Sequence, residues 1–439
     1  MRKFSSYYID DVSLFTKKLL SWSRNYKEIC ILDSNNYPNI LTSDHTYHDY
    51  DVIAGIGSLK TFSPQHGKLL PALERFVSDS DDWIFGHLGY DLKNETEALS
   101  SVHPDYIKFP PVSFFIPIYI FLLRDKTLSV GWETYCNNEF EIEAMVREIQ
   151  NSPPPFTMDI NIEKITKRIS RPVYLESVEK IKSHIQRGDI YEINFCQEFF
   201  SEKSFIDPPL TWIRLTEESP TPFSCYYRVQ DKYLLCASPE RFLKKAGNRI
   251  ISQPIKGTAK RGRTPEEDLL MAGSLVTDPK ERAENIMITD LVRNDLSKIA
   301  TDASVRVDEL CAVYPFPHVY QMQSSVSATL PSKIMFTDII RSAFPMGSMT
   351  GAPKIRAMEI IEQYEKSRRG LFSGSVGYIT PEKDFDFNVV IRSIQYNQTD
   401  SFLSFIVGGA ITSLSVPEKE YNECLLKAEA IMKTLNQNM

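Results

Sequence analysis

Residues 238–258 read SPERFLKKAGNRIISQPIKGT, and this stretch has the pattern of a β-hairpin. Two extended segments flank an Ala-Gly-Asn turn, whose residues tolerate positive φ. A turn centred on Gly247 places Glu240 opposite Pro254, and strand alternation then directs Glu240 and Lys256 toward the same face. Such an acid and amine either act on one bound molecule or form an ordinary cross-strand ion pair.

The composition is typical of a globular protein with a large core. Of the 439 residues, 42% are hydrophobic and 24% are charged, and the formal net charge of −7 is spread along the chain. The absence of a basic block and of a long apolar run predicts no nucleic-acid partner and no membrane span. The seven cysteines include no CxxC pair, and no apolar signal core follows the N-terminus. We therefore expect a cytoplasmic protein with reduced thiols.

The prolines 153–155 mark a boundary between an N-terminal part, 1–155, and a second part, 156–439. We do not expect the two parts to be independent folding units. The apolar run 112–123 is predicted to be one buried strand, although it contains Pro117. Helices are predicted at 11–26, 67–78, 171–187, 208–217, 278–292 and 353–366. Because hairpins are frequent and βαβ repeats few, the pattern favours an α+β fold with antiparallel sheets over a doubly wound sheet.

The predicted helix 278–292 carries a carboxylate on its apolar face. Glu284 shares this face with Ile288 and Leu291, and Asp278 is a suitable N-cap. A carboxylate in such a place must be paired, protonated or bound to a cation. A salt bridge to Lys280, four residues earlier, is the simpler alternative.

The last predicted helix begins with a capping-box pattern at 415–418. Glu420, Glu423 and Lys427 follow on one face of this helix. Two acids one turn apart can share a divalent ion, and oxygen ligands with retained waters suit Mg²⁺. A solvated helix face is the commoner use of such residues, and the proximity of Glu284 to this pair is a hypothesis.

Two glycine-bearing loops, 345–353 and 407–411, are candidates for binding an anion through backbone N–H groups. The hydroxyls of Ser348 and Thr350 belong to the first loop. Arg392 lies within an apolar run that we expect to be a strand, so its guanidinium needs a carboxylate partner from the protein or from a ligand.

Several blocks of sequence resemble the chorismate-binding region of aminodeoxychorismate and anthranilate synthases, from about residue 170 to 432. These blocks are GDIYEINFCQEF, ASPERFL, PIKGT, DPKERAENIMITDLVRNDLSKI, PHVYQMQS, FPMGSMTGAPKIRAMEIIE, GSVGYI, FNVVIRSI and VGGAIT followed by EYNECLLKA. The N-terminal part is more weakly similar to the same family. The resemblance implies an α+β fold with large antiparallel sheets in a sandwich-like core, helices outside and the site between them.

The resemblance also implies the roles of particular residues. It assigns Mg²⁺ to Glu284, Glu420 and Glu423. It places the carboxylates of chorismate near Arg392, Tyr378, Lys427, Ser348, Gly408 and Gly409. Lys256 matches the lysine that attacks ring C2, and Glu240 matches the acid that protonates the C4 hydroxyl. The lysine must be neutral to attack, so we expect its pKa to be lowered. Thr258 and His318 lie in matching blocks and complete the candidate catalytic residues, although a lone histidine between aromatics is more often a packed core residue.

The implied enzyme is an Mg²⁺-dependent, transaminase-class synthase that aminates chorismate at C4. Lys256 is decisive because anthranilate synthases normally have alanine at this position. Anthranilate synthesis is the alternative function, and a non-catalytic carboxylate-binding homologue is the third. The chain lacks the cysteine elbow of an amidotransferase, so we expect a separate glutamine amidotransferase subunit to supply ammonia, with free ammonia as the alternative source. Two residues depart from the family pattern: Glu192 replaces a usual glutamine, and Ala410 replaces a usual glycine.

Overall fold

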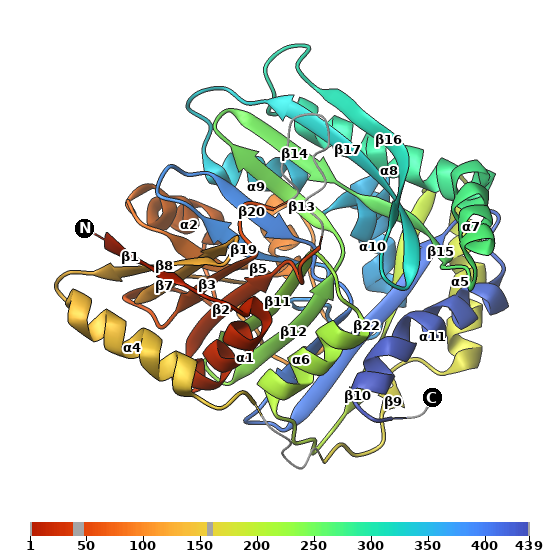
Figure 1. The fold of residues 1–439 in the computed structure, drawn as a ribbon. Coiled ribbons are helices and arrows are strands. Elements are labelled where there is room, and N and C mark those ends of the chain that lie inside the picture. The colour runs from red at the N-terminus through yellow and green to blue at the C-terminus, as the bar shows by residue number, and fades with distance from the viewer. Residues whose placement is uncertain (1, 38–47, 156–160, 438–439) are drawn as a thin grey trace.

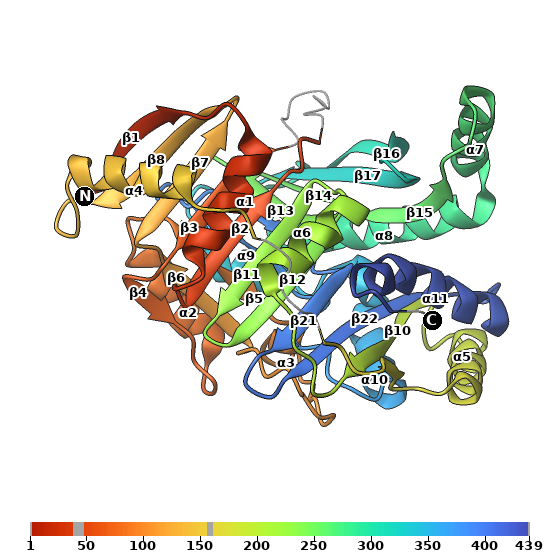
Figure 2. The same ribbon diagram turned by 60° about the horizontal axis from the view of Figure 1, so that its bottom comes forward.

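Two large antiparallel β-sheets lie face to face at the centre of the protein, and helices cover their outer faces (Figures 1 and 2). This arrangement comes from a computed structural model that describes residues 2–37, 48–155 and 161–437. It confirms the predicted α+β fold. No helix within these ranges combines the length and the apolar character that a membrane span requires.

The first sheet has the strand order β1-β8-β7-β3-β2-β11-β12-β21-β22-β10-β18, and β9 pairs with β10. Its strands are β1 (Arg2–Tyr8), β2 (Glu28–Asp33), β3 (Val52–Ile56), β7 (Tyr119–Arg124), β8 (Thr127–Glu133), β9 (Thr166–Lys167), β10 (Glu192–Ser201), β11 (Phe223–Val229), β12 (Lys232–Ser238), β18 (Gly351–Ala352), β21 (Ser393–Asn397) and β22 (Phe402–Ile411).

The second sheet has the order β15-β17-β14-β13-β20-β19-β5-β6-β4, and β16 pairs with β17. Its strands are β4 (Lys60–Phe62), β5 (Ile84–Leu88), β6 (Val112–Ile116), β13 (Arg241–Ala246), β14 (Arg249–Gln253), β15 (Ile255–Lys260), β16 (Arg306–Pro315), β17 (Val319–Thr329), β19 (Ser375–Ile379) and β20 (Phe385–Asn388). Strands from before and after the prolines 153–155 join both sheets, so neither part of the chain has a sheet of its own. The start of the second part, at residues 156–160, lies outside the described residues.

Three apolar layers hold the helices and sheets together. One lies between the first sheet and the helices α1, α4, α5, α6, α10 and α11, and includes Leu19 and Ile181. A second packs α2, α8 and α9 against the second sheet, and a third, with Ile53 and Phe85, fills the space between the sheets. The helices are α1 (Val12–Ser23), α2 (Leu69–Ser78), α3 (Lys93–Thr96), α4 (Glu139–Asn151), α5 (Arg171–Gln186), α6 (Pro208–Glu218), α7 (Pro265–Thr277), α8 (Pro279–Ser297), α9 (Phe336–Ala343), α10 (Lys354–Tyr364) and α11 (Pro417–Thr434).

The predicted hairpin is confirmed as β13 and β14. Ala246 pairs with Arg249 across the two-residue turn, in which Gly247 has a φ of +60°. Pro254 ends the hairpin, because proline has no N–H to donate to a neighbouring strand. After Pro254 the chain continues as β15, which pairs with β17 instead of β13.

Two local predictions are wrong. The run 112–123 is two strands and not one, because Pro117 interrupts it, and β6 and β7 belong to different sheets. The predicted capping box at 415–418 is also absent. Val416 is the N-cap of α11 and makes no side-chain cap, while the Ser415 hydroxyl accepts a hydrogen bond from the Thr412 N–H and Glu418 pairs with Arg171.

Candidate active site

Lys256 lies where β15 is irregular against its partner. Ile255 pairs with Gln323 and Thr258 with Gln321, so two residues, Lys256 and Gly257, stand opposite one. Gly257 has a φ of +101°, a conformation that favours glycine. The Asn285 side-chain N–H₂ group on α8 donates to the Lys256 carbonyl oxygen at 3.1 Å. The irregularity thereby brings Lys256 against α8.

The Lys256 amine is buried beside a carboxylate. Its Nζ lies 3.1 Å from Glu192 Oε1, and the side chains are 12% and 1% exposed respectively. Burial alone disfavours the ammonium form, but the charges of Glu192, Glu284 and Glu240 outweigh burial and raise the pKa of Lys256. The expectation of a lowered pKa is therefore wrong for these surroundings, since carboxylates and not cations surround the amine.

Glu240 lies between β12 and β13 and is 3% exposed. The Ser348 hydroxyl donates a hydrogen bond to its Oε1 at 2.6 Å. Burial raises the pKa of Glu240 to about 7, and the Ser348 hydrogen bond and the charges of Lys256 and Arg392 act in the opposite direction. A carboxyl group with such a pKa can hold a proton near neutral pH and donate it.

Arg392 does not lie in a strand, which corrects the prediction. It lies between β20 and β21 with a φ of +51°, and its carbonyl oxygen accepts a hydrogen bond from the Ala237 N–H. No hydrogen bond or ion pair joins its guanidinium to another described residue. Burial lowers the pKa of Arg392 and Glu240 opposes that effect. The guanidinium therefore remains available to a carboxylate of a ligand.

Carboxylates from two helices meet at Lys280, where α8 and α11 approach each other beside β15 and β22 (Figure 2). Lys280 Nζ lies 3.7 Å from Glu284 Oε1 and 3.7 Å from Glu420 Oε1. Burial raises the pKa of Glu284 to about 7, although Lys256 partly opposes this. The salt bridge expected as an alternative is thus present, and it also brings Glu284 and Glu420 together.

Glu423 points to a different partner. Its Oε1 lies 2.9 Å from Lys427 Nζ, and its side chain is about half exposed. Burial opposes ionisation of Glu423, but the neighbouring Lys427 lowers its pKa overall. Within the described ranges, no three His, Cys, Asp or Glu side chains converge as a ready set of metal ligands.

Glu284 and Glu420 nevertheless fit a magnesium ion. Their oxygens face one cation, the Lys280 ammonium, and the buried Glu284 Oε1 has no hydrogen-bond partner among the described residues. Mg²⁺ in proteins is often bound by one or two carboxylates and keeps several waters. A pair of carboxylates is therefore a sufficient donor set.

Gly408 and Gly409 border this acidic group from within β22, so the predicted loop 407–411 is instead part of a strand that pairs with β10. A Cβ on Gly409 would lie 3.6–3.8 Å from Glu423 Oε1, Lys427 Nζ and Glu420 Oε2. The backbone at Gly409 therefore faces the charged groups of these three side chains. The Lys427 amine donates to the Gly408 carbonyl oxygen at 3.0 Å. Lys427 thus lies at the edge of the site together with both glycines.

The loop 345–353 has a different contact from the predicted one. Its Ser348 hydroxyl is engaged by Glu240, and its Thr350 hydroxyl, which is fully buried, donates to the Met346 carbonyl oxygen. The side chains of this loop therefore position the protein's own carboxyl group, whereas we expected them to face an anion.

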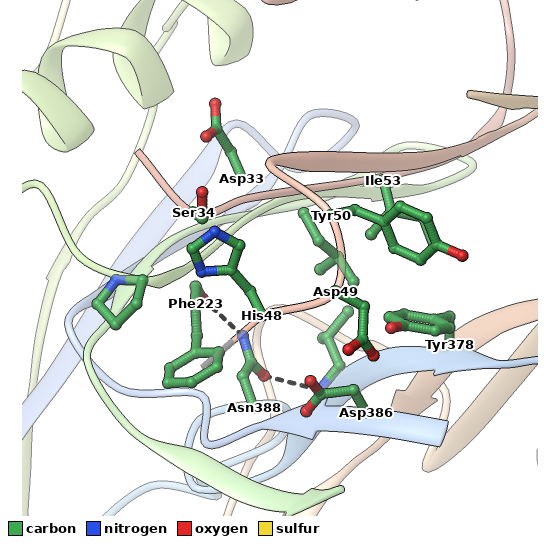
Figure 3. A pocket seen from close by; sticks show the side chains of 13 residues that line it. Asp33, Ser34, His48, Asp49, Tyr50, Ile53, Phe223, Tyr378, Asp386 and Asn388 are labelled. Carbon is green, nitrogen blue, oxygen red and sulfur yellow. Dashed lines mark hydrogen bonds between the residues drawn. The ribbon is translucent and has the colours of Figure 1, made fainter. Parts of the chain in front are cut away.

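Three predicted residues do not join the Lys256 cluster. Tyr378 lines a cavity between the sheets with His48, Asp386 and Asn388 (Figure 3). Its ring also contacts Trp83. His318 is exposed at the end of the β16–β17 hairpin, so neither a catalytic role nor the expected core position is supported. Thr258 is exposed opposite Gln321, beyond the irregularity that holds Lys256.

Three residues of the site have no role predicted from the sequence. Glu192, which stands where a glutamine is usual, is the ion-pair partner of Lys256. Glu281 lies one turn before Glu284, with its Oε2 near Gly257. Its spacing of three residues from Glu284 places both carboxylates on the same helix face, and this spacing could have indicated Glu281 from the sequence. Asn285 holds the Lys256 backbone, and no pattern in the sequence indicates that contact.

Comparisons with known proteins identify relatives of this chain. A family model described as chorismate binding enzyme matches residues 30–433. The chain is 34% identical over 424 residues to aminodeoxychorismate synthase component 1 of Escherichia coli (strain K12). The alignment covers 90% of this chain and 92% of the relative. It is 31% identical to anthranilate synthase component 1 of Aquifex aeolicus, over 86% of this chain and 77% of the relative.

A longer relative and a solved structure are also similar to this chain. The chain is 34% identical to the probable chloroplastic aminodeoxychorismate synthase of Oryza sativa subsp. japonica and spans only 43% of its length. The crystal structure of anthranilate synthase component I from Streptococcus pneumoniae TIGR4 superposes with a TM-score of 0.77 at 23% identity, over 90% of this chain and 94% of that one. At this identity the superposition supports the fold alone.

Proposed function

Because this chain belongs to the family of chorismate binding enzymes, we propose that it forms 4-amino-4-deoxychorismate from chorismate and ammonia. The observation that carries the proposal is the buried Lys256, which lies 3.1 Å from Glu192 and within electrostatic reach of Glu240. An amine and a protonated carboxyl group near one another can attack and protonate the two ends of an allylic alcohol.

In the proposed reaction, Arg392 holds a carboxylate of chorismate and Glu240 donates its proton to the C4 hydroxyl. The neutral Lys256 amine forms a bond to C2 while both conjugated ring double bonds shift and the C4–O bond breaks, which releases water. Ammonia then forms a bond to C4, both double bonds shift back and the C2–N bond to Lys256 breaks. The new ammonium group returns a proton to Glu240, so the protons balance.

Glu284 and Glu420 are proposed to hold Mg²⁺, which when bound neutralises negative charge on the substrate. Replacing Glu420 with Gln should weaken Mg²⁺ binding about tenfold or more, measured by titration calorimetry, because one of two anionic ligands is lost. Glu418→Gln on the same helix is the control, since Glu418 pairs with Arg171. Equal Mg²⁺ affinities of the two variants would show that Glu420 does not bind the metal.

Ammonia is proposed to come from a separate glutamine amidotransferase subunit. The relatives' names contain "component 1", which implies a second component in those proteins. Glutamine-dependent turnover should therefore require addition of such a subunit, whereas ammonia-dependent turnover should not.

Product identification tests the proposed function directly. The purified protein is incubated with chorismate, Mg²⁺ and ammonia, and the products are separated by chromatography with mass detection. Aminodeoxychorismate, which an added lyase converts to p-aminobenzoate, is the expected product. Fluorescent anthranilate would instead assign the chain to the alternative function, and binding without any aminated product would indicate a non-catalytic homologue.

A further inference from the structure

Glu192 lies beside the Lys256 amine, and the reaction described above does not use it. Its side chain is 1% exposed, and its Oε1 lies 3.1 Å from Lys256 Nζ. Its other oxygen, Oε2, is buried and has no hydrogen-bond partner among the described residues. A buried carboxylate oxygen without a partner is costly while the group is charged, and a bound proton reduces that cost.

The fold holds Glu192 firmly in this position. The Tyr191 N–H donates to the Ala352 carbonyl oxygen at 2.7 Å, and the Asn194 N–H donates to the Thr350 carbonyl oxygen at 2.8 Å. Gly351 lies between these two contacts, and a Cβ there would be 2.2 Å from the Glu192 carbonyl oxygen. The start of β10 is thus fixed on β18, and Glu192 projects from it toward Lys256.

The other charged groups around the pair come from four elements. Glu281 and Glu284 face it from α8 together with Lys280, and Glu423 faces it from α11. Glu240 and Arg392 face it from the segments that follow β12 and β20. Among the described residues, only Glu192 lies within 4 Å of the Lys256 amine as an ion-pair partner. A proton that leaves Lys256 therefore has Glu192 as its nearest acceptor.

Building on the proposed function, we propose that Glu192 is the base that takes the proton from Lys256 before the lysine attacks. The Lys256 N–H bond breaks and an O–H bond forms on Glu192, so that a neutral amine lies beside a neutral carboxylic acid. The amine then bonds to C2. When ammonia has bonded to C4 and the C2–N bond breaks, Lys256 leaves as the neutral amine and takes its proton back from Glu192.

The physical reason is the burial of both groups. Moving the proton from Lys256 to Glu192 converts two buried charges into two neutral groups, and a buried environment disfavours the charged forms. The number of bound protons is the same before and after this transfer. The fraction of neutral amine is therefore independent of pH while the pair holds one shared proton.

The test compares wild-type protein with Glu192→Gln across a range of pH. Without the carboxylate, the Lys256 proton must leave to solvent, so the fraction of neutral amine rises with pH. We expect kcat of the variant to fall about tenfold or more near neutral pH, and the ratio of its kcat to that of wild type to rise about tenfold per pH unit. Taking the ratio removes the titration of groups that both proteins share, such as Glu240.

Two further variants keep the test decisive. Glu198→Gln removes another buried carboxylate of β10, one that pairs with Arg168, and its kcat ratio should not change with pH. Glu192→Asp keeps a carboxylate, so its ratio should also stay constant even if its kcat is lower. A constant ratio for Glu192→Gln, with kcat within about threefold of wild type, would overturn the proposal. So would a ratio that rises with pH for Glu192→Asp.

A second measurement follows the reactivity of the Lys256 amine in the absence of chorismate. Competitive acetylation by acetic anhydride, followed by peptide mass spectrometry, gives the pH at which Lys256 becomes reactive. Glu192→Gln should lower this pH by about one unit or more, because the ammonium loses its adjacent anion. An unchanged value in a protein that forms aminodeoxychorismate would overturn the role of Glu192 alone. Absence of aminodeoxychorismate in wild type, with the shift in reactivity present, would instead show that the proposed function fails.

Discussion

Two of the buried pairs of a cation with a carboxylate, Arg241–Asp386 and Lys256–Glu192, differ in how the proton is held. Arg241 on β13 contacts Asp386 through two hydrogen bonds, at 2.9 and 3.0 Å, beside the cavity that Tyr378 lines (Figure 3). Lys256 on β15 contacts Glu192 through one atom at 3.1 Å. Both pairs are almost entirely shielded from solvent.

The difference separates a structural pair from a reactive one. Arginine keeps its proton in proteins, and its planar guanidinium matches a carboxylate in a fixed geometry. A lysine amine can lose its proton when its surroundings favour the neutral form. We infer that breaking the Arg241–Asp386 pair lowers stability, whereas changing the Lys256 site lowers turnover.

The largest effect is expected for Lys256→Ala. Aminodeoxychorismate formation should fall by about a thousandfold or more, because the proposed adduct at C2 cannot form. Turnover is followed by chromatography with mass detection. Lys260→Ala, an exposed lysine of the same strand, is the matched control. Turnover of Lys256→Ala within tenfold of wild type would contradict the covalent step.

Glu240→Gln should lower kcat by about a hundredfold, because glutamine cannot donate a proton to the leaving hydroxyl. The raised pKa of Glu240, about 7, also fixes the direction of the pH dependence. The acid form is required, so kcat of wild type should fall as pH rises through about 7. The residual activity of the variant should lack this decrease; if it decreases in the same way, another group is the acid.

Asp386→Ala should lower the free energy of unfolding by about 3 kcal/mol, because the buried Arg241 would lose its carboxylate partner. Denaturant unfolding measures this effect. Asp384→Ala is the comparison, since Asp384 pairs with Lys245 and is about one-third exposed; its cost should not exceed about 1 kcal/mol. Steady-state kinetics of folded Asp386→Ala should give a kcat near that of wild type. A large loss of kcat would contradict the assignment of Arg241–Asp386 as a structural pair and Lys256–Glu192 as a reactive one.

Gly351→Ala should lower the free energy of unfolding by about 1–3 kcal/mol, because the added Cβ meets the Glu192 carbonyl oxygen and the φ of +151° disfavours a side chain. Gly273→Ala in α7 is the control. No atom lies within 4 Å of a Cβ at Gly273, so this helical substitution should raise stability by about 0.5–1 kcal/mol. Equal unfolding midpoints for the two variants would show that β10 tolerates displacement at Glu192.

The smallest effect is expected for Tyr378→Phe. Tyr378 lines the cavity beside Arg241 and Asp386, so its hydroxyl should not contact chorismate. We expect KM and kcat to stay within about twofold of wild type. A large increase in KM would restore the prediction made from the family resemblance and would place Tyr378 at the substrate.

Much of the fold and part of the site could be predicted from the sequence because the relevant signals are local. Turn residues at 246–248 specified the hairpin, and Asp278 followed by Pro279 specified the start of α8. Helical spacing placed Glu284 on the inner face of α8 and Glu420 and Glu423 on one face of α11. The expected proximity of Glu284 to Glu420 is confirmed by their shared contact with Lys280.

Other features depend on contacts between distant segments. Glu192 and Lys256 are separated by 64 residues, as their numbers show, and meet only because the starts of β10 and β15 come together in the fold. Ser348 contacts Glu240 across 108 residues. The motif around Tyr378 does not reveal which of two polar sites its side chain faces, and the structure places it at the cavity beside Asp386.

The sequence by itself determined the α+β class, most of the helices, the β13–β14 hairpin that precedes Lys256 and the family. These follow from periodicity, turn chemistry and short motifs, all of which act within a few residues. Only the tertiary structure decided which charges are neighbours: Lys256 with Glu192, Ser348 with Glu240, and Lys280 between Glu284 and Glu420. The physical reason is that electrostatic interactions and pKa values depend on distance and burial in space, and neither quantity is encoded in local sequence.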